Sequence, residues 1–185
     1  RFITHRLPKR LPATRKVKYK DNLMNAYDNS IRYTDNFLAR IIHLLKQQQV
    51  DASMLYTSDH GEDIFDDGRH LFLHASPVPS YYQLHVPLLL WTSDSYREEY
   101  PGIEKAASMN RQKNISSSIS FFQTMMELAG IETPYRNDSL SVTSPLYTEK
   151  SRVYLNDHNE PRPLDDIGMR KEDFEMLKKR GIDAQ

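Results

Sequence analysis

Hydrophobic residues recur every three or four positions over residues 21–48, and this spacing predicts one long amphipathic helix. Its apolar stripe consists of Leu23, Tyr27, Ile31, Thr34, Leu38, Ile41 and Leu45. Asp21 stands directly before the stripe, where a carboxylate can accept hydrogen bonds from the first unpaired backbone N–H groups. We therefore expect Asp21 to be the N-cap of this helix.

Two short, continuous apolar runs predict strands that are covered on both faces. The first is Ser53–Thr57 (SMLYT), and the second spans residues 86–91 (VPLLLW). Pro87 lies inside the second run, so this strand either lies at a sheet edge or begins just after the proline. Residues 63–82, between the two runs, are rich in Asp, His, Pro and Ser and predict an irregular loop.

The second half of the chain predicts a helix, a strand and a final helix. Residues 93–114 are polar and predict a loop. The following helix has Asn114 or Ser116 as its N-cap and Gly130 as its terminator. Its apolar face consists of Ile119, Phe122, Met126 and Ala129. Residues 152–155 predict a strand, and residues 171–180 predict a charged helix that ends before Gly181. This order of elements is typical of an α/β domain.

Composition excludes several classes of function. The 185 residues carry 25 basic and 25 acidic side chains, so the charge gives no reason to expect a nucleic-acid partner. The absence of cysteine excludes disulfides, thiolate zinc sites and cysteine nucleophiles. The longest apolar run is far shorter than the roughly 20 residues that span a bilayer. The length suits one domain of ordinary size, or most of one.

Residues 59–74 contain the densest group of chemically active side chains. Asp59 and His60 directly follow the first strand, at a position where open α/β sheets bind their ligands. Carboxylate and imidazole are the groups that bind zinc when cysteine is absent. With His74 they predict a divalent metal site, and Glu62 is placed to orient a ligand or to hold a substrate ammonium. A solvated loop is the alternative interpretation, because an Asp-His pair alone is common.

Several segments carry a resemblance to a known family. They are residues 56–62 (YTSDHGE), 72–77 (FLHASP), 86–91 (VPLLLW), 25–35 (NAYDNSIRYTD), 121–131 (FFQTMMELAGI) and, loosely, 152–155 (RVYL). Together they resemble the phosphoethanolamine transferases of the alkaline phosphatase/sulfatase superfamily. The resemblance implies an α/β sandwich with a central mixed sheet flanked by helices. It implies that residues 1–185 are the C-terminal portion of one catalytic domain, with residues 1–20 as a linker-like segment.

The resemblance also implies an activity and a place in the cell. These enzymes are anchored in the inner membrane and face the periplasm. A threonine attacks the phosphate of phosphatidylethanolamine and diacylglycerol leaves, and the phosphoethanolamine then passes to a hydroxyl of an envelope glycan such as lipid A. Asp59 and His60 match ligands of the zinc that activates the nucleophile, and His74 matches a ligand on the second-metal or phosphate side. Glu62 falls near the bound substrate, and one or two zinc ions are implied. His70 lies in the same loop as His74, where it either contacts the phosphate or is a solvated loop residue.

The resemblance predicts no catalytic nucleophile in this chain. The family's threonine, an early acidic zinc ligand and the membrane anchor are expected upstream, and His5 does not match the family's Gly-Ser-His step. Thr57 and Ser58 stand where the family has structural residues. His85 is expected to be structural and His158 to lie in a turn. The alternatives are a sulfatase or phosphoglycerol transferase of the same fold, which the upstream nucleophile would distinguish, and a non-catalytic remnant.

Overall fold

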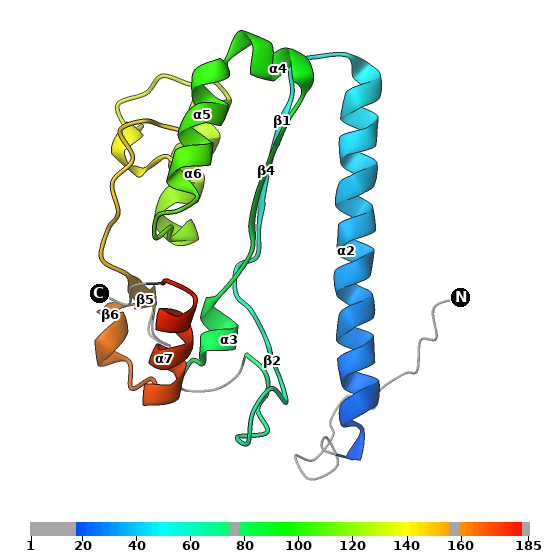
Figure 1. Ribbon diagram of the computed structural model, residues 1–185, viewed down its shortest axis with the longest axis vertical. Coiled ribbons are helices and arrows are strands. Elements are labelled where there is room, and N and C mark those ends of the chain that lie inside the picture. The colour runs from blue at the N-terminus through cyan, green and yellow to red at the C-terminus, as the bar shows by residue number, and fades with distance from the viewer. Residues whose placement is uncertain (1–17, 75–77, 156–159, 183–185) are drawn as a thin grey trace.

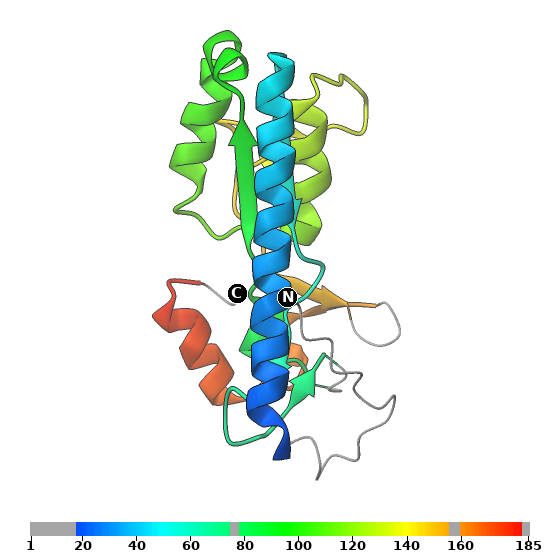
Figure 2. The same cartoon turned by 90° about the vertical axis from the view of Figure 1, so that its right-hand side faces the viewer.

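The computed structural model describes residues 18–74, 78–155 and 160–182. His5, His158, residues 75–77 and all but the end of the expected linker lie outside the described residues. The long helix α2 (Lys20–Gln48) runs along one side of an antiparallel ribbon formed by β1 (Ser53–Thr57) and β4 (Leu88–Thr92). Helices α5 (Pro101–Asn110) and α6 (Ser117–Leu128) lie on the other side of this ribbon (Figures 1 and 2).

Helix α2 confirms the predicted amphipathic pattern. Leu23 is buried, and most other members of the apolar stripe are half-buried, although Ile31 is 52% exposed. The prediction of Asp21 as N-cap was wrong. The N-cap is Tyr19, two residues earlier, the helix begins at Lys20, and no side chain caps it. Asp21 lies instead in the first turn, where its negative charge interacts favourably with the helix dipole.

The ribbon confirms both predicted strands. In β1 and β4, Ser53 pairs with Thr92 and Thr57 with Leu88, so β4 begins just after Pro87. The described strands form three two-stranded antiparallel sheets, and these stand where a larger mixed sheet was expected. The prediction that the strands are covered on both faces was wrong for β4, since Leu89 is 48% exposed. Within the described helices, none is long and apolar enough to cross a membrane.

Two segments predicted as loops contain regular structure, so these predictions were wrong. Residues 63–82 hold a hairpin of β2 (Asp63–Ile64) and β3 (Phe72–Leu73), followed by the start of helix α3 (Tyr81–Leu84). Residues 93–114 hold α4 (Asp94–Glu99) and α5. Helices α3 and α4, of 4 and 6 residues, are too short to show an apolar stripe, and local capping starts them instead. Ser80 accepts the Gln83 N–H and Ser93 accepts the Tyr96 N–H, while Pro101 opens α5.

Helix α6 ends as predicted and packs on a buried polar segment. Its N-cap is Ser116, and Gly130 follows its C-cap with a φ of 62°. Beyond it lies the 3-10 helix η1 (Asp138–Leu140). The hydroxyls of the next segment are buried, and Thr143 Oγ1 donates to Glu127 Oε2 over 2.7 Å. Because these polar groups satisfy one another, this half of the domain packs without a large apolar core.

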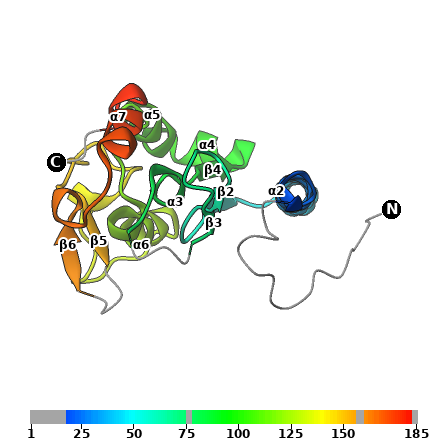
Figure 3. The ribbon, with the colours of Figure 1, turned by 90° about the horizontal axis from the view of Figure 1, so that it is seen from below.

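The C-terminal elements gather around α3. Strand β5 (Val153–Leu155) pairs with β6 (Pro161–Pro163), followed by the 3-10 helix η2 (Leu164–Asp166) and α7 (Lys171–Lys179). Predicted strand 152–155 and predicted helix 171–180 are confirmed within one residue at each end. The buried cluster there consists of Tyr81, Leu164, Met169 and Leu177. Figure 3 shows these elements grouped on the side of the domain away from α2.

Candidate metal centre

His60, Glu62 and His74 come together at the end of β1. Each offers a ligand atom, and these atoms all lie within 4.8 Å of one another. Nδ1 of His74 is 2.9 Å from Glu62 Oε1, and the centroids of the two imidazole rings are 3.9 Å apart. The β2–β3 hairpin causes this meeting, because Asp63 pairs with Leu73 and so brings their neighbours, Glu62 and His74, close together.

The chemistry of this group fits a divalent metal ion. Two imidazoles and one carboxylate are a ligand set that zinc accepts in proteins. Glu62 Oε2 is buried and has no hydrogen-bond partner among the described residues. Since buried carboxylate oxygens are nearly always satisfied, an ion or ligand group is the natural partner of this atom. The group therefore suits a metal or a bound substrate.

Hydrogen bonds at the ring nitrogens indicate which atoms are available to a metal. Nδ1 of His60 lies 3.0 Å from the Gly61 carbonyl oxygen, and Nδ1 of His74 faces Glu62. When both Nδ1–H groups donate to these acceptors, each Nε2 keeps its lone pair. Metal-bound histidines have this arrangement, in which the second ring N–H is held by a carbonyl or carboxylate.

Asp59 and His70 lie outside the three-residue cluster. The Asp59 side chain is 87% exposed, and its Oδ2 is 3.6 Å from Nε2 of His60, on the side of that ring away from Glu62. Hydrogen bonding by the His60 backbone N–H lowers the pKa of Asp59, so the carboxylate is charged at neutral pH. His70 is exposed, with a φ of 53°. The metal role of Asp59 and the phosphate role of His70 stay predictions.

Glu62 is the residue whose position the sequence pattern left most open. It was placed near a ligand or a substrate ammonium, and the structure puts it between the two histidines. A signal was present, since alternate residues of an extended segment point the same way and His60 and Glu62 are two apart. Its contact with His74 depends on the hairpin, which the sequence pattern did not predict. Thr57 and Ser58 donate their hydroxyls to backbone carbonyls, in keeping with structural roles.

A close backbone contact fixes the loop that carries His60 and Glu62. The Gly61 N–H donates to the Gln83 carbonyl over 2.8 Å, and a Cβ at position 61 would lie 2.0 Å from the Tyr82 carbonyl oxygen. One residue beyond Glu62, the Asp63 carboxylate is buried and accepts the Ser80 hydroxyl over 2.7 Å and the Gln83 side-chain amide. Helix α3 and its N-cap therefore set the path of the site loop.

A buried ion pair connects α3 with the C-terminal helix. Asp173 of α7 is 2% exposed and receives two hydrogen bonds from the Arg69 guanidinium, at 2.7 and 2.9 Å. The same carboxylate accepts the Tyr81 N–H over 3.0 Å. Asp67 also binds Arg69, and both carboxylates raise the pKa of the guanidinium. Thus α7 anchors both α3 and the turn between β2 and β3.

Asp67→Asn should remove a small contribution to acid-dependent stability. The Arg69 side chain lowers the pKa of Asp67, so the folded carboxyl binds its proton less readily than the unfolded one. The stabilisation is present above the unfolded pKa of about 3.9 and is lost as pH falls through the folded value. Because Asp67 is partly exposed, we expect below about 1 kcal/mol at pH 7. Urea unfolding at several pH values measures it.

The control for this prediction is Asp51→Asn, at an exposed residue after α2. The difference in unfolding free energy between wild type and Asp67→Asn should shrink toward zero in acid, whereas the control should show no such trend. A difference that stays constant from neutral to strongly acidic pH would contradict the prediction.

A family of known proteins is similar to this chain over the segments that form the site. The family model described as Sulfatase matches residues 4–131. Phosphoethanolamine transferase EptA of Escherichia coli (strain K12) is 35% identical over 120 residues, which are 63% of this chain and 22% of that protein. Kdo(2)-lipid A phosphoethanolamine 7''-transferase of the same strain is 28% identical over 120 residues, or 62% of this chain and 20% of that protein. The chain thus spans about a fifth of the length of these relatives.

Solved structures show the same fold. The C-terminal periplasmic domain of EcEptC from Escherichia coli matches with a TM-score of 0.65 and 26% identity, covering 82% of this chain and 40% of that one. The corresponding domain of phosphoethanolamine transferase EptC from Campylobacter jejuni matches with a TM-score of 0.58 and 27% identity, over 71% of this chain and 41% of that one. The predicted resemblance is confirmed, and the chain belongs to the sulfatase family, as part of an α/β catalytic domain shared with phosphoethanolamine transferases.

Proposed function

We propose that this chain forms part of the active site of a zinc-dependent phosphoethanolamine transferase. The headgroup would move from phosphatidylethanolamine to a hydroxyl of an envelope glycan such as lipid A, at the periplasmic side of the inner membrane. The observation that carries this proposal is the cluster of His60, Glu62 and His74 at the end of β1. It lies in a chain whose relatives are named phosphoethanolamine transferases.

In this proposal Nε2 of His60 and Nε2 of His74 bind zinc, with Asp59 approaching from the Nε2 side of His60. Bound zinc supplies positive charge that lowers the pKa of a coordinated hydroxyl and neutralises charge on the phosphoryl group. Glu62 holds the His74 ring through Oε1. His70 is proposed to contact the phosphate from the adjacent turn. Neither Thr57 nor Ser58 is assigned as the attacking hydroxyl, because both already donate to backbone carbonyls.

Zinc content and headgroup transfer test this proposal together. We would measure both on the intact natural protein and on its His60→Ala and His74→Ala variants. Wild-type protein should contain zinc and transfer labelled headgroup from phosphatidylethanolamine to lipid A, and each variant should lose zinc because a ligand is removed. His43→Ala is the matched control, since His43 is an exposed histidine of α2 far along the helix from the site.

Two results would contradict the proposal. Wild-type protein that stays free of metal after zinc is supplied would remove the metal mechanism. Zinc-loaded protein that cleaves a sulfate ester, and transfers no headgroup, would assign the site to a sulfatase.

A further inference from the structure

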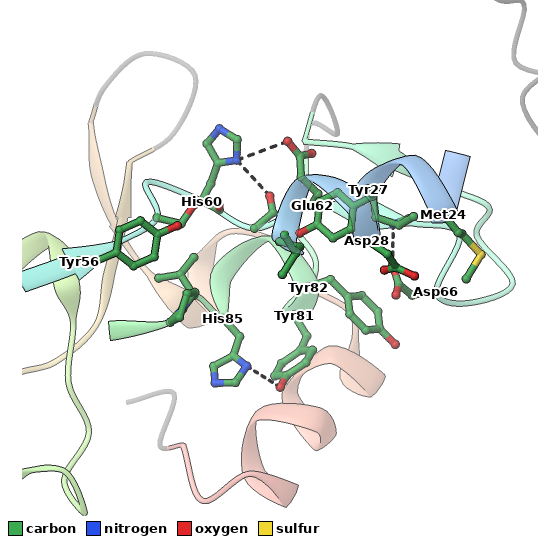
Figure 4. Close-up of a pocket in the computed structure, with 16 residues that line it drawn as sticks. Met24, Tyr27, Asp28, Tyr56, His60, Glu62, Asp66, Tyr81, Tyr82 and His85 are labelled. Carbon is green, nitrogen blue, oxygen red and sulfur yellow. Dashed lines mark hydrogen bonds and ion pairs between the residues drawn. The ribbon is translucent and has the colours of Figure 1, made fainter. Parts of the chain in front are cut away.

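A cavity lies beside the candidate metal centre, between α2 and the loop after β1. Its volume is about 360 Å³, and His60 and Glu62 line it together with residues of α2 and α3. Figure 4 shows the tyrosine and carboxylate side chains around it. Its lining differs from an ordinary apolar pocket because it combines aromatic rings with acidic groups. The tyrosines and acidic residues of the lining are Tyr27, Tyr56, Tyr81, Tyr82, Asp28, Glu62 and Asp66.

The charge around this cavity is negative. Three carboxylates line it, and among the described residues no lysine or arginine does. Burial raises the pKa of Tyr27, and the nearby charges of Glu62 and Asp66 raise it further. The buried Oε2 of Glu62, without a described partner, belongs to the same lining.

We propose that this cavity binds the primary ammonium group of the phosphoethanolamine headgroup while the phosphate lies at the metal centre. This inference rests on the function proposed above. Carboxylates neutralise the ammonium charge, and tyrosine rings attract a cation through their π faces. The two-carbon spacer of ethanolamine is short, so the ammonium site must adjoin the phosphate site. The cavity meets this condition because His60 and Glu62 belong to both.

A second metal ion fits the cavity less well than an ammonium group does. Among the described residues, Asp28 and Asp66 do not join the group whose ligand atoms lie within 4.8 Å of one another. One Asp66 oxygen also accepts the Ile64 N–H over 2.6 Å. Carboxylates spread around a cavity suit an organic cation better than a bare ion, which needs its ligands close together.

The test compares ligands that share the phosphate but differ in the ammonium. Calorimetry on the intact, zinc-loaded natural protein would measure the Kd values of phosphoethanolamine and inorganic phosphate. The variant is Asp28→Asn with Asp66→Asn, and the control is Asp35→Asn with Asp51→Asn. The control makes the same change of charge at exposed positions that do not line the cavity.

We expect the cavity variant to bind phosphoethanolamine about tenfold more weakly, with its zinc content and phosphate affinity unchanged. The control should bind both ligands as wild type does. Equal weakening of both ligands, or no weakening of either, would overturn the cavity assignment. If transfer activity persists in that case, the proposed function stands without this subsite. Wild-type protein that neither binds nor transfers the headgroup would overturn both proposals.

Discussion

Gly61→Ala should displace the loop that carries His60 and Glu62 and abolish the metal site. The added Cβ would lie 2.0 Å from the Tyr82 carbonyl oxygen. Its nearest neighbours, in Tyr82 and Gln83, are all backbone atoms, so no flexible side chain can move away. Relief requires the loop to separate from α3, which breaks the hydrogen bond from the Gly61 N–H to the Gln83 carbonyl. We expect a loss of about 3 kcal/mol or more in unfolding free energy.

Gly61→Ala should lower headgroup transfer as well as stability. A displacement of about 1 Å at a catalytic group can lower the rate about a hundredfold, and we expect at least that loss of headgroup transfer. Zinc content, transfer rate and urea unfolding would be measured on the same preparation. Gly68→Ala is the matched control, since it lies in the adjacent turn and its Cβ would meet nothing within 4 Å. Wild-type zinc content in Gly61→Ala would contradict the expectation.

Asp173→Ala should cause the second large effect, although this residue lies outside the span of the family-model match. The substitution leaves the Arg69 guanidinium, with a side chain only 10% exposed, paired with the partly exposed Asp67 alone. It also removes the acceptor of the Tyr81 N–H at the start of α3. Breaking a buried ion pair from one side costs about 3–5 kcal/mol, and we expect a loss in that range.

Because α3 fixes the path of the site loop, Asp173→Ala should also weaken zinc binding. The control is Glu172→Ala, at the exposed neighbouring position in the first turn of α7. Chemical denaturation and a competition assay with a zinc chelator would compare the two variants. An Asp173→Ala protein as stable as the control would show that water replaces the carboxylate at no net cost. The proposed link from α7 to the site would then be wrong.

The ion pair also illustrates a limit of sequence interpretation. Arg69 and Asp173 are 104 positions apart, and nothing in the local pattern of either segment indicates that they meet. The same holds for Asp63, which looked like one of several acidic loop residues and is instead buried with Ser80 and Gln83. Buried polar pairs depend on which segments the fold brings together, and hydrophobic periodicity carries no information about that.

Sequence alone determined the features that depend on local interactions. The apolar stripe of α2, the bounds of β1, the start of β4 after Pro87 and the end of α6 before Gly130 all follow from side-chain spacing and backbone restriction within a few residues. The adjacent residues Asp59 and His60 at a strand end likewise indicated where the candidate site lies, because a strand end can be located from the local pattern.

Tertiary structure decided how that site is assembled. The hairpin register of β2 and β3 brought Glu62 to His74, and helix α3 fixed the path of Gly61 and Asp63. The position of α2 opposite the site loop forms the acidic, aromatic cavity. Each of these features requires segments distant in sequence to pack at van der Waals or hydrogen-bonding distance. Their geometry is therefore set by the whole fold, since no single segment contains the atoms that determine it.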